Sequence, residues 1–392
     1  MTAPLILSPQ PTPRQRLTQM VKRTAAEHGL SLARVTTADP FSDLVPILLD
    51  RIQSGHLAGL DWFTPQRAIE SIDPATIHPA PVSILSVGLP YHTPDPGKPD
   101  DGVHRGRIAR YARGEDYHRV LRQRMDQFVE TLAADLGRDI VSRRVTDTAR
   151  VVDRAVAARS GLGWYGKNAC IIVPEHGSWV ILGEVLLDLD LEPDAPLHRN
   201  CGQCAICIDR CPTGAIVAPY VIDAPTCLSF QTIEQRGPIP HELRRHLGDW
   251  VFGCDVCQTV CPYDRAATGP HDPVFAPRAI ENAYPSLEWL LAISESEFRD
   301  TYRGTPVIRA KRHGMARNAA VALGNTGDDR SVPPLIAALE THDHPLVRTH
   351  AAWSLGVIGG SAAISALDHT RTHDPDPDVR AEAVAALVGD LD

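Results

Sequence analysis

Residues 201–216 read CGQCAICIDRCPTGAI, and residues 254–264 read CDVCQTVCPYD. The first segment has the spacing C-x2-C-x2-C-x3-C-P, which is typical of the loops that bind 4Fe-4S clusters in bacterial ferredoxins. The second segment ends in the same way but lacks the first cysteine of the pattern, and Cys227 is the only nearby cysteine that could replace it. The two segments therefore predict a ferredoxin-like module with two 4Fe-4S clusters.

The order of the cysteines also predicts how they are shared between the clusters. In ferredoxins with two clusters, the fourth cysteine of each run binds the cluster of the other run. The first set of ligands is then Cys201, Cys204, Cys207 and Cys261, and the second set is Cys211, Cys227, Cys254 and Cys257. Zinc is an alternative, but three cysteines followed by Cys-Pro are unusual for zinc, and no targeting signal indicates an oxidising compartment for disulfides. We expect the remaining cysteine, Cys170, to be a buried structural residue because apolar residues follow it.

Length and composition describe an ordinary globular protein with several cores. The chain has 392 residues, of which 43% are hydrophobic and 22% are charged, and its formal net charge is -9. No apolar run is long enough to cross a bilayer, and residues 1–16 do not resemble a signal peptide. We therefore expect a cytoplasmic protein that makes no membrane contact. We also expect a monomer.

Three regions follow one another along the chain. Residues 1–195 alternate helical stretches with short β-type runs such as PVSILSVGLPY, which predicts a layered α/β domain. Residues 196–270 are rich in loops and cysteines, as a ferredoxin-like module would be. In residues 271–392, similar segments begin at Arg317, Arg348 and Arg380, and intervals of 31 and 32 residues predict an all-α module of HEAT-like repeats. Such a module either presents a surface to a partner or simply covers the large domain.

Basic residues cluster in two segments despite the negative net charge. RGRIARYARGEDYHRVLRQR, residues 105–124, contains seven arginines, and RGTPVIRAKRHGMAR, residues 303–317, contains five basic residues and no acid. A solvated charged surface is one interpretation of such runs. Next to a repeat module, a binding surface for a large polyanion is the other.

The two cysteine runs and four further segments together resemble the epoxyqueuosine reductase family. The further segments are VTDTARVVDRAVAARSGLGWYGKN, GSWVILGEVLLDLDLEPD, CLSFQTIEQRGPIP and RAKRHGMARNAAVALGN, and the resemblance covers residues 15–390. It implies that the α/β domain binds cobalamin and that the substrate is a tRNA whose wobble base carries epoxyqueuosine. Co(I) cobalamin would open the epoxide, with electrons passed through two 4Fe-4S clusters from an external low-potential donor.

The same resemblance implies roles for individual residues. Asp147, from the Asp-Thr pair, corresponds to the proton donor of the family, although an aspartate before Thr-Ala could also cap a helix. To be protonated at neutral pH, this carboxyl would need a pKa raised by roughly three units, which burial can provide. The corrin-lining residues implied by the family are Arg67, Ala109, Asp147, Lys167, Asn168, Ile171, Leu182, Ser229 and Asp255. Arg154 and Arg236 resemble tRNA contacts, and the second basic run adds Arg309, Lys311 and Arg312.

Two other functions remain open on the sequence. A relative of the reductive dehalogenases would combine a cobalamin domain with two clusters and reduce a small molecule, although the repeats and the basic runs disfavour it. An electron-transfer or scaffold protein would use the clusters and repeats without catalysis. A corrinoid absorption spectrum of the purified protein would separate this last possibility from the two enzymes.

Overall fold

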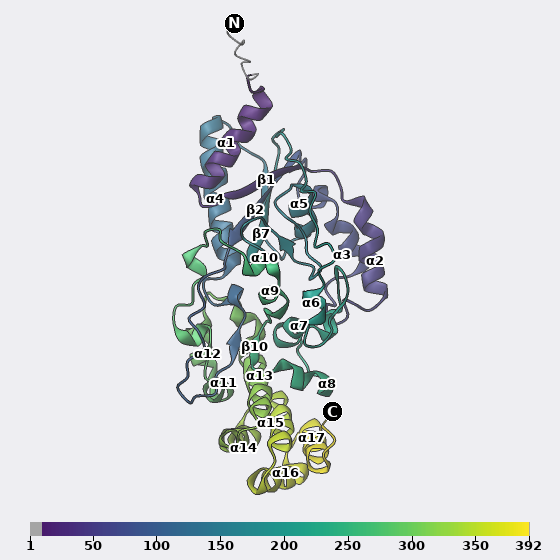
Figure 1. Cartoon of the computed structure of the whole chain (residues 1–392), viewed down its shortest axis with the longest axis vertical. Helices are drawn as coiled ribbons and strands as arrows, with labels where there is room; N and C mark the ends of the chain where they lie inside the picture. The colour runs from purple at the N-terminus through teal and green to yellow at the C-terminus, as the bar shows by residue number, and fades with distance from the viewer. Residues whose placement is uncertain (1–9, 392) are drawn as a thin grey trace.

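The computed structural model describes residues 10–391, so residues 1–9 and 392, at the two ends of the predicted regions, lie outside the described part. The molecule is elongated (Figure 1). Its N-terminal region lies at one end, the cysteine-rich region lies in the middle, and the C-terminal helices lie at the other end. Within the described residues, no helix combines the length and the hydropathy that crossing a membrane requires.

A sheet of four strands forms the centre of the N-terminal region. Its order is β1 (Leu32–Thr37), β2 (Ser83–Pro90), β7 (Val180–Leu187) and β4 (Ser142–Val145). All three pairings are antiparallel, so the sheet is not built from βαβ units. The apolar runs predicted as strands do form the two central strands, and every residue of β2 is buried. A strand that is covered on both faces needs apolar side chains on both faces, which explains its nearly continuous apolar sequence.

Helices cover both faces of this sheet, which gives the predicted layers. On one face, α1 (Pro13–Glu27) and α4 (Tyr117–Leu136) pack against β1, β2 and β7 in one apolar core. On the other face, α5 (Asp153–Arg159) and α2 (Val45–Gln53) pack against β2, β4 and β7. The short helix α3 (Pro65–Ser71) packs beside α2.

The middle region contains short elements separated by loops. Its helices are α6 (Ile206–Asp209), α7 (Leu228–Ile233), α8 (His241–Arg244), α9 (Val256–Thr259) and α10 (Pro262–Arg265). Short strand pairs are β5 (Trp164–Tyr165) with β6 (Ile171–Ile172), and β8 (Ile216–Ala218) with β9 (Val221–Ile222). A parallel pairing of β10 (Trp250–Phe252) with β3 (Arg107–Ile108) ties this region to the N-terminal region.

Seven helices follow in the C-terminal region. They are α11 (Leu287–Ala292), α12 (Glu295–Tyr302), α13 (Lys311–Thr326), α14 (Val332–Thr341), α15 (Pro345–Ile358), α16 (Ser361–His373) and α17 (Pro377–Val388). The last five stack as helical hairpins around one apolar core that also includes residues of α11 and α12. The helices that begin the predicted repeats are α13, α15 and α17, and α15 packs between the other two.

Buried polar side chains fasten α13 to the cysteine-rich region. Arg317 is 1% exposed and donates hydrogen bonds to the backbone oxygens of Gln231, Gln235 and Gly237. Next to it, the Asn318 amide donates to two further backbone oxygens of the cysteine-rich region. Arg317 therefore has a structural role, and it is not available to the polyanion surface that the second basic run predicts.

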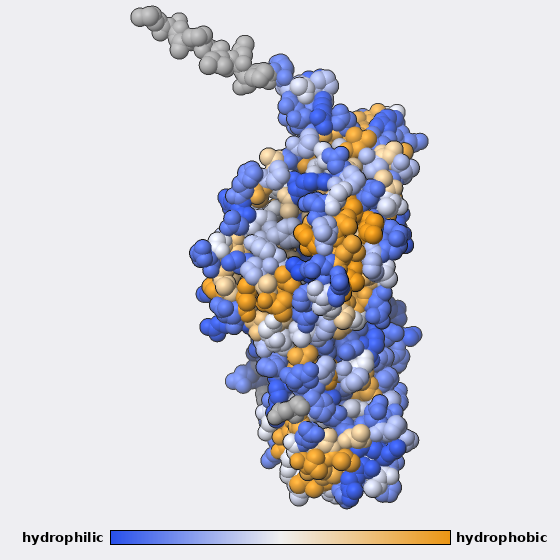
Figure 2. Space-filling model, turned by 90° about the vertical axis from the view of Figure 1, so that its right-hand side faces the viewer, coloured by the Kyte–Doolittle hydropathy of each residue, from blue (hydrophilic) through white to orange (hydrophobic). Residues whose placement is uncertain are grey.

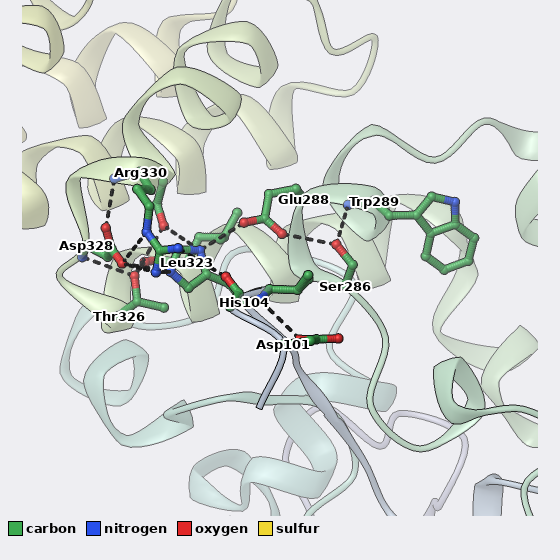
Figure 3. Close-up of polar contacts among 12 residues, drawn as sticks. Asp101, His104, Ser286, Glu288, Trp289, Leu323, Thr326, Asp328 and Arg330 are labelled. Carbon is green, nitrogen blue, oxygen red and sulfur yellow. Dashed lines mark hydrogen bonds and ion pairs between the residues drawn. The ribbon is translucent and has the colours of Figure 1, made fainter. Parts of the chain in front are cut away.

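A second polar contact joins the C-terminal helices to the loop before β3. His104 lies between two carboxylates, with Nδ1 2.9 Å from Glu288 and Nε2 3.0 Å from Asp328 (Figure 3). Arg330 pairs with Asp328 and also donates to the backbone oxygen of Gly102. Together with β3 and β10, this network holds the three regions in one arrangement.

Candidate active site and cysteine centres

Asp147 lies in the loop between β4 and α5, at one end of the central sheet. Its φ is 53°, in the left-handed region that few residues other than glycine adopt, so the loop holds this residue in an uncommon conformation. The side chain is 61% exposed. The carboxylate is therefore presented to solvent at the surface of the N-terminal region instead of being buried under it.

Two side chains at the start of α4 contact this carboxylate. The Tyr117 hydroxyl donates to Oδ2 of Asp147 at 2.6 Å, and Nε2 of His118 lies 3.5 Å from the same oxygen. The two rings stack, with centroids 4.1 Å apart. Asp116 caps α4 and lies 2.9 Å from Nδ1 of His118, so the imidazole lies between two carboxylates. Folding therefore brings Asp116, Tyr117, His118 and Asp147 into one polar cluster.

The charges in this cluster determine where a proton resides. The pKa of His118 is raised to about 9, chiefly by the hydrogen bonds to Asp116 and then to Asp147. The pKa of Asp147 is lowered, and the hydrogen bond from His118 is the largest cause. Burial does raise the pKa of Asp147, as expected, but His118 outweighs it, so the pKa is lowered overall and the expected net rise is wrong for this structure. At neutral pH the cluster holds a proton on His118 and a negative charge on Asp147.

The first predicted set of cysteines surrounds one cavity. Its lining includes Cys201, Cys204, Cys207 and Cys261 together with Lys167 and Asn168. Cys201 and Cys261 pack against Trp164 and Ile172, so one wall of the cavity is apolar. In residues 10–391, no three His, Cys, Asp or Glu side chains converge as ligands of a single metal ion would. The four thiols are instead spread around the cavity.

The second predicted set also gathers in one place. Burial raises the pKa of Cys254 to about 12, and Cys227 and Cys211 add to this rise. The pKa of Cys257 is raised by burial in the same way, with contributions from Cys170, Cys254 and Cys227. Thiols that raise one another's pKa lie close together. Cys254 is therefore close to Cys211, Cys227 and Cys257, and Cys170 adjoins this set.

The ninth cysteine lies between the two sets and belongs to neither run. Cys170 is partly buried, and its pKa is raised to about 12 by burial, with smaller contributions from Cys261 and Cys207. Its backbone N–H donates to the Asn168 side chain at 3.2 Å. The strong effect of burial on this pKa agrees with the prediction of a buried thiol.

Four of the predicted corrin-lining residues lie around β5, β6 and β7. Lys167 donates from Nζ to the backbone oxygen of Gly202 at 2.8 Å, at the edge of the first cysteine cavity. Asn168 is 2% exposed and its amide lies 3.5 Å from the backbone oxygen of Cys257. Ile171 and Leu182 belong to one apolar cluster beside the sheet. These residues thus connect the sheet to both cysteine groups.

The remaining predicted corrin-lining residues approach from other elements. Arg67 donates to the backbone oxygen of Thr148, next to Asp147. Ala109 is buried beside β10, and Ser229 lies in α7, two residues after Cys227. Asp255 is 3% exposed and accepts a hydrogen bond from the backbone N–H of Arg110, and burial raises its pKa to about 6.

The predicted tRNA-contacting residues are mostly engaged within the chain. Arg154 donates to the backbone oxygen of Ala169, and Arg236 donates to that of Arg309. Arg309 pairs with Glu234, and it lies close enough to Asp147 to contribute to the lowered pKa of that carboxyl. Arg312 is bidentate to Asp343, with distances of 2.5 and 2.6 Å. Lys311 is exposed, with a φ of 62°.

Sequence reasoning missed Tyr117 and His118, which lie inside the first basic run. Asp116 before Tyr117 is a helix N-cap signal, and this signal could have placed both residues in the first turn of a helix. Their contact with Asp147, 30 residues further along the chain, exists only because β4 and α4 lie at the same end of the sheet. No local pattern could have predicted this contact.

Three family models match separate parts of the chain. The model of the 4Fe-4S double cluster binding domain matches residues 200–264, and the model of HEAT repeats matches residues 310–388. A third model, described as epoxyqueuosine reductase QueG, DUF1730, matches residues 72–148. The predictions of a two-cluster module and of HEAT-type repeats are therefore confirmed.

Curated relatives extend this similarity over most of the chain. An epoxyqueuosine reductase of Xanthomonas campestris is 36% identical over 345 residues, which cover 86% of this chain and 95% of that protein. The chain belongs to the epoxyqueuosine reductase family. A relative from Gloeobacter violaceus with the same name is 39% identical over 313 residues, covering 78% of this chain and 94% of that protein. The resemblance predicted from the sequence motifs is confirmed.

Solved structures of this family have the same fold. A crystal structure of epoxyqueuosine reductase with an epoxyqueuosine-modified tRNA-Tyr stem loop matches with a TM-score of 0.89 at 32% identity, covering 95% of this chain and 98% of that one. The enzyme from Streptococcus thermophilus matches with a TM-score of 0.85 at 29% identity, with the same coverage. The family membership favours the first of the three functions considered from the sequence.

Proposed function

We propose that the protein reduces epoxyqueuosine to queuosine at the wobble position of tRNA, as an oxidoreductase with a cobalamin and two 4Fe-4S clusters. The observation that carries this proposal is the match over 95% of the chain to an epoxyqueuosine reductase crystallised with its modified stem loop. That match includes the sheet, the cysteine-rich region and the helical repeats. The polar cluster of Asp147 is the second support, because His118 carries a proton beside an exposed carboxylate.

The net reaction fixes what the site must provide. Both bonds from the epoxide oxygen to carbon break, the carbons are left joined by a double bond, and the oxygen leaves as water. This change consumes two electrons and two protons. The electrons would come from an external low-potential donor through the clusters. The protons must come from side chains and, in the end, from solvent.

We assign the two clusters to the two groups of thiols. Cys201, Cys204, Cys207 and Cys261 would hold one cluster, because they line one cavity. Cys211, Cys227, Cys254 and Cys257 would hold the other, because their thiols influence one another. Binding of iron requires thiolates, so the raised pKa of the buried thiols means that cluster assembly releases protons.

The residues between the sheet and the cysteine groups fit a corrin. A corrin has a broad apolar ring edged by amide side chains, so it needs apolar side chains next to hydrogen-bond donors and acceptors. Ile171 and Leu182 provide an apolar surface, while Lys167, Asn168 and Arg67 provide donors. Ala109, Ser229 and Asp255 would border the ring from the cysteine-rich region. When bound and reduced, cobalamin would supply the nucleophile that opens the epoxide.

The side chains around Asp147 would hold the first proton and transfer it to the substrate. Arriving substrate would shield Asp147 from solvent, and the proton on His118 could then move to the Asp147 carboxylate. Tyr117 donates to the same carboxylate oxygen and so fixes its direction. Asp147 would donate this proton to the epoxide oxygen as that oxygen becomes negative. Arg309 would hold the tRNA near the loop, because it lies beside Asp147 and on the C-terminal region.

The experiment that tests this function is a single assay. Protein with reconstituted clusters and cobalamin is incubated with a low-potential reductant and tRNA that carries epoxyqueuosine, and the nucleosides are then analysed. We expect queuosine to replace epoxyqueuosine, and we expect no conversion when cobalamin or reductant is omitted. Unchanged epoxyqueuosine in the complete mixture, with iron and cobalamin both bound, would overturn the proposal.

A further inference from the structure

Glu184 is a glutamate in the middle of the central sheet. It lies on β7, is 0% exposed, and the hydrogen-bond partner of its carboxyl is another carboxyl, that of Asp153. Its opposite neighbours in the strand register are Ser86 on β2 and Val145 on β4. An ionised carboxyl in this position would be desolvated without compensation, so the fold favours the protonated acid.

The surroundings of Glu184 connect it to Asp147. Val145, directly across from Glu184, is two residues before Asp147 in the chain. Ala155 and Val156 of α5 pack on this face of the sheet with Val145, which brings Asp153, the first residue of α5, to the same side. Asp153 is the charged group that acts most strongly on Glu184, and Asp147 acts on both of them. Three carboxyl groups thus form a series from the sheet interior to the exposed loop.

Both inner members of this series have a raised pKa. Burial is the largest cause for both; the next cause is the negative charge of Asp153 for Glu184 and that of Asp147 for Asp153, while the hydrogen bond to Glu184 lowers the pKa of Asp153. The other charged group facing the pair is Arg154, which lowers the pKa of Asp153. Ser86 and Val145 do not titrate in this range. The hydroxyl oxygen of Ser86 is unpartnered in the described part of the chain, so Ser86 places a group beside Glu184 that can both donate and accept.

A structural role does not explain this glutamate. Its hydrogen-bond partner is a second acid, Asp153, and no basic side chain pairs with it within residues 10–391. The other residues of β7 on this face, Val180, Leu182 and Leu186, are apolar and pack in cores. A leucine would fill the same position with a larger gain from burial. Residues that break a local rule without a structural benefit are concentrated at functional sites.

We infer that Glu184, together with Asp153, stores a proton behind the catalytic loop and supplies it to Asp147 during turnover. This inference rests on the proposed function, in which the epoxide oxygen needs two protons to leave as water. Asp147 gives one proton to the oxygen, and the O–H bond of the inner carboxyl pair breaks to protonate Asp147 again. The reformed Asp147 acid delivers the second proton, and the pair regains its own from solvent. The electrons follow a separate route from the low-potential donor.

The first test measures the stored proton without any reaction. The infrared spectrum of the purified protein at neutral pH should contain a carbonyl band of a protonated carboxyl, and Glu184→Gln should remove it. Glu382→Gln is the matched control. Glu382 is a buried glutamate of α17, in the distant helical repeats, and it pairs with Arg244. This control should keep the band. A spectrum that is the same for the wild type and Glu184→Gln would overturn the inference, whatever the activity.

The second test measures the use of the proton. Gln replaces a neutral acid by a neutral group of the same shape, so Glu184→Gln should keep its iron and its tRNA affinity. Its single-turnover rate should fall by about 10- to 100-fold, near or below the lower end of direct general acid catalysis. Glu184→Asp keeps a carboxyl and should recover part of the rate. Rates equal to the wild type at every pH would overturn the inference.

Two further outcomes, a Glu184→Gln variant that does not fold and a wild type without activity, can be told apart from a failure of the inference. If Glu184→Gln does not fold, Asp153→Asn tests the other member of the inner pair and should give the same loss of rate with iron and tRNA affinity retained. An Asp153→Asn protein with an unchanged pH profile would contradict the relay. If the wild type converts no epoxyqueuosine, the proposed function fails, while the infrared result still decides whether Glu184 holds a proton.

Discussion

The cysteine groups and the Asp147 site shift the pKa of their acidic side chains in opposite directions. In the cysteine groups, burial raises the pKa of thiols such as Cys254 and Cys257, so the proposed ligands would be neutral until a metal replaces the proton. At Asp147, the neighbouring His118 lowers the pKa of an exposed carboxyl, so the acid is ionised and its proton resides on the histidine. The cysteine groups would need a metal cation to become functional, whereas the Asp147 site already contains a positive and a negative side chain.

This difference separates the two halves of the proposed reaction. Electron transfer depends on metal that must be loaded into the middle of the molecule, whereas proton transfer uses side chains that the fold assembles by itself. Apolar side chains are also unevenly spread over the surface. Figure 2 shows them gathered over the upper half of one face and again near the C-terminal helices. The cysteine groups and the Asp147 site share no side chains, so substitutions in one of these sites should leave the other intact.

The largest expected effect is on the electron side. Cys227→Ser should remove the cluster of the second group, because the shortened run has no other cysteine in this place. Turnover should fall to the background, and iron should drop from about eight to about four per chain. Affinity for tRNA should be retained. Cys170→Ser is the matched control and should keep about eight irons, since Cys170 belongs to neither group. A Cys227→Ser protein with about eight irons would contradict the assignment.

The next effect is on the proton side. Asp147→Asn keeps the shape and the hydrogen bond from Tyr117 but has no proton to give, so the rate should fall by about 10²- to 10⁴-fold. Iron content and tRNA affinity should match the wild type, which would establish that the two regions are independent. Asn is also an acceptable residue at a helix cap, so a purely structural Asp147 predicts little change. Turnover close to that of the wild type would exclude the role of acid.

The two regions also differ in how far the sequence predicts them. Cysteine ligands lie in short runs whose spacing reflects the geometry of a cluster, so the spacing alone groups Cys201 to Cys211. The helical repeats and the two central strands are predictable for a similar reason, because their periodicity is local. The polar cluster around Asp147 joins β4 to the first turn of α4, and only the packing of the sheet decides that contact.

Charge is the least reliable guide in the sequence. The family role of Asp147 predicts a buried carboxyl, but the side chain is exposed and next to a cation. Arg317 lies in a run that predicts a basic surface, yet it is buried and bonded to backbone oxygens, and burial lowers its pKa to about 9. Glu184 does carry a local signal, since it is the one acid in the apolar run WVILGEVLL and so marks a buried carboxyl. The sequence shows which residues are charged but not which of them meet solvent.

A third prediction tests whether the basic residues around the start of α13 bind tRNA independently of the cysteine groups. Changing Arg309, Lys311 and Arg312 to Ala should weaken tRNA binding by about tenfold and reduce the salt slope by about one to two. The reduction is smaller than three because Arg309 and Arg312 already pair with Glu234 and Asp343. Iron content should not change. Arg371→Ala, an exposed pair with Asp368 in α16, is the control. An unchanged salt slope in the triple variant would assign these residues to a solvated surface.

The smallest effect concerns the cation that distinguishes the Asp147 site. The pKa of His118 is raised to about 9 from an ordinary value near 6.5, so its charge stabilises the folded state. This contribution is complete below about pH 6.5 and disappears as the pH rises through about 9. The side chain is 37% exposed, so solvent screening limits the contribution to about 1 kcal/mol or less.

His118→Gln should therefore lower the free energy of unfolding in urea by about this amount in mild acid and by nearly nothing at alkaline pH. Tyr117→Phe is the matched control, because it removes the other hydrogen bond to Asp147 but keeps the imidazole. Its effect on stability should not follow the titration of His118. If His118→Gln destabilises the protein equally at both ends of the pH range, the histidine acts through packing, and the proton at this site is not held by the pair with Asp147. Asp147 would then be ionised only because it is exposed, and not because His118 lowers its pKa. The comparison with the thiols, whose pKa is raised by burial, would lose its physical basis.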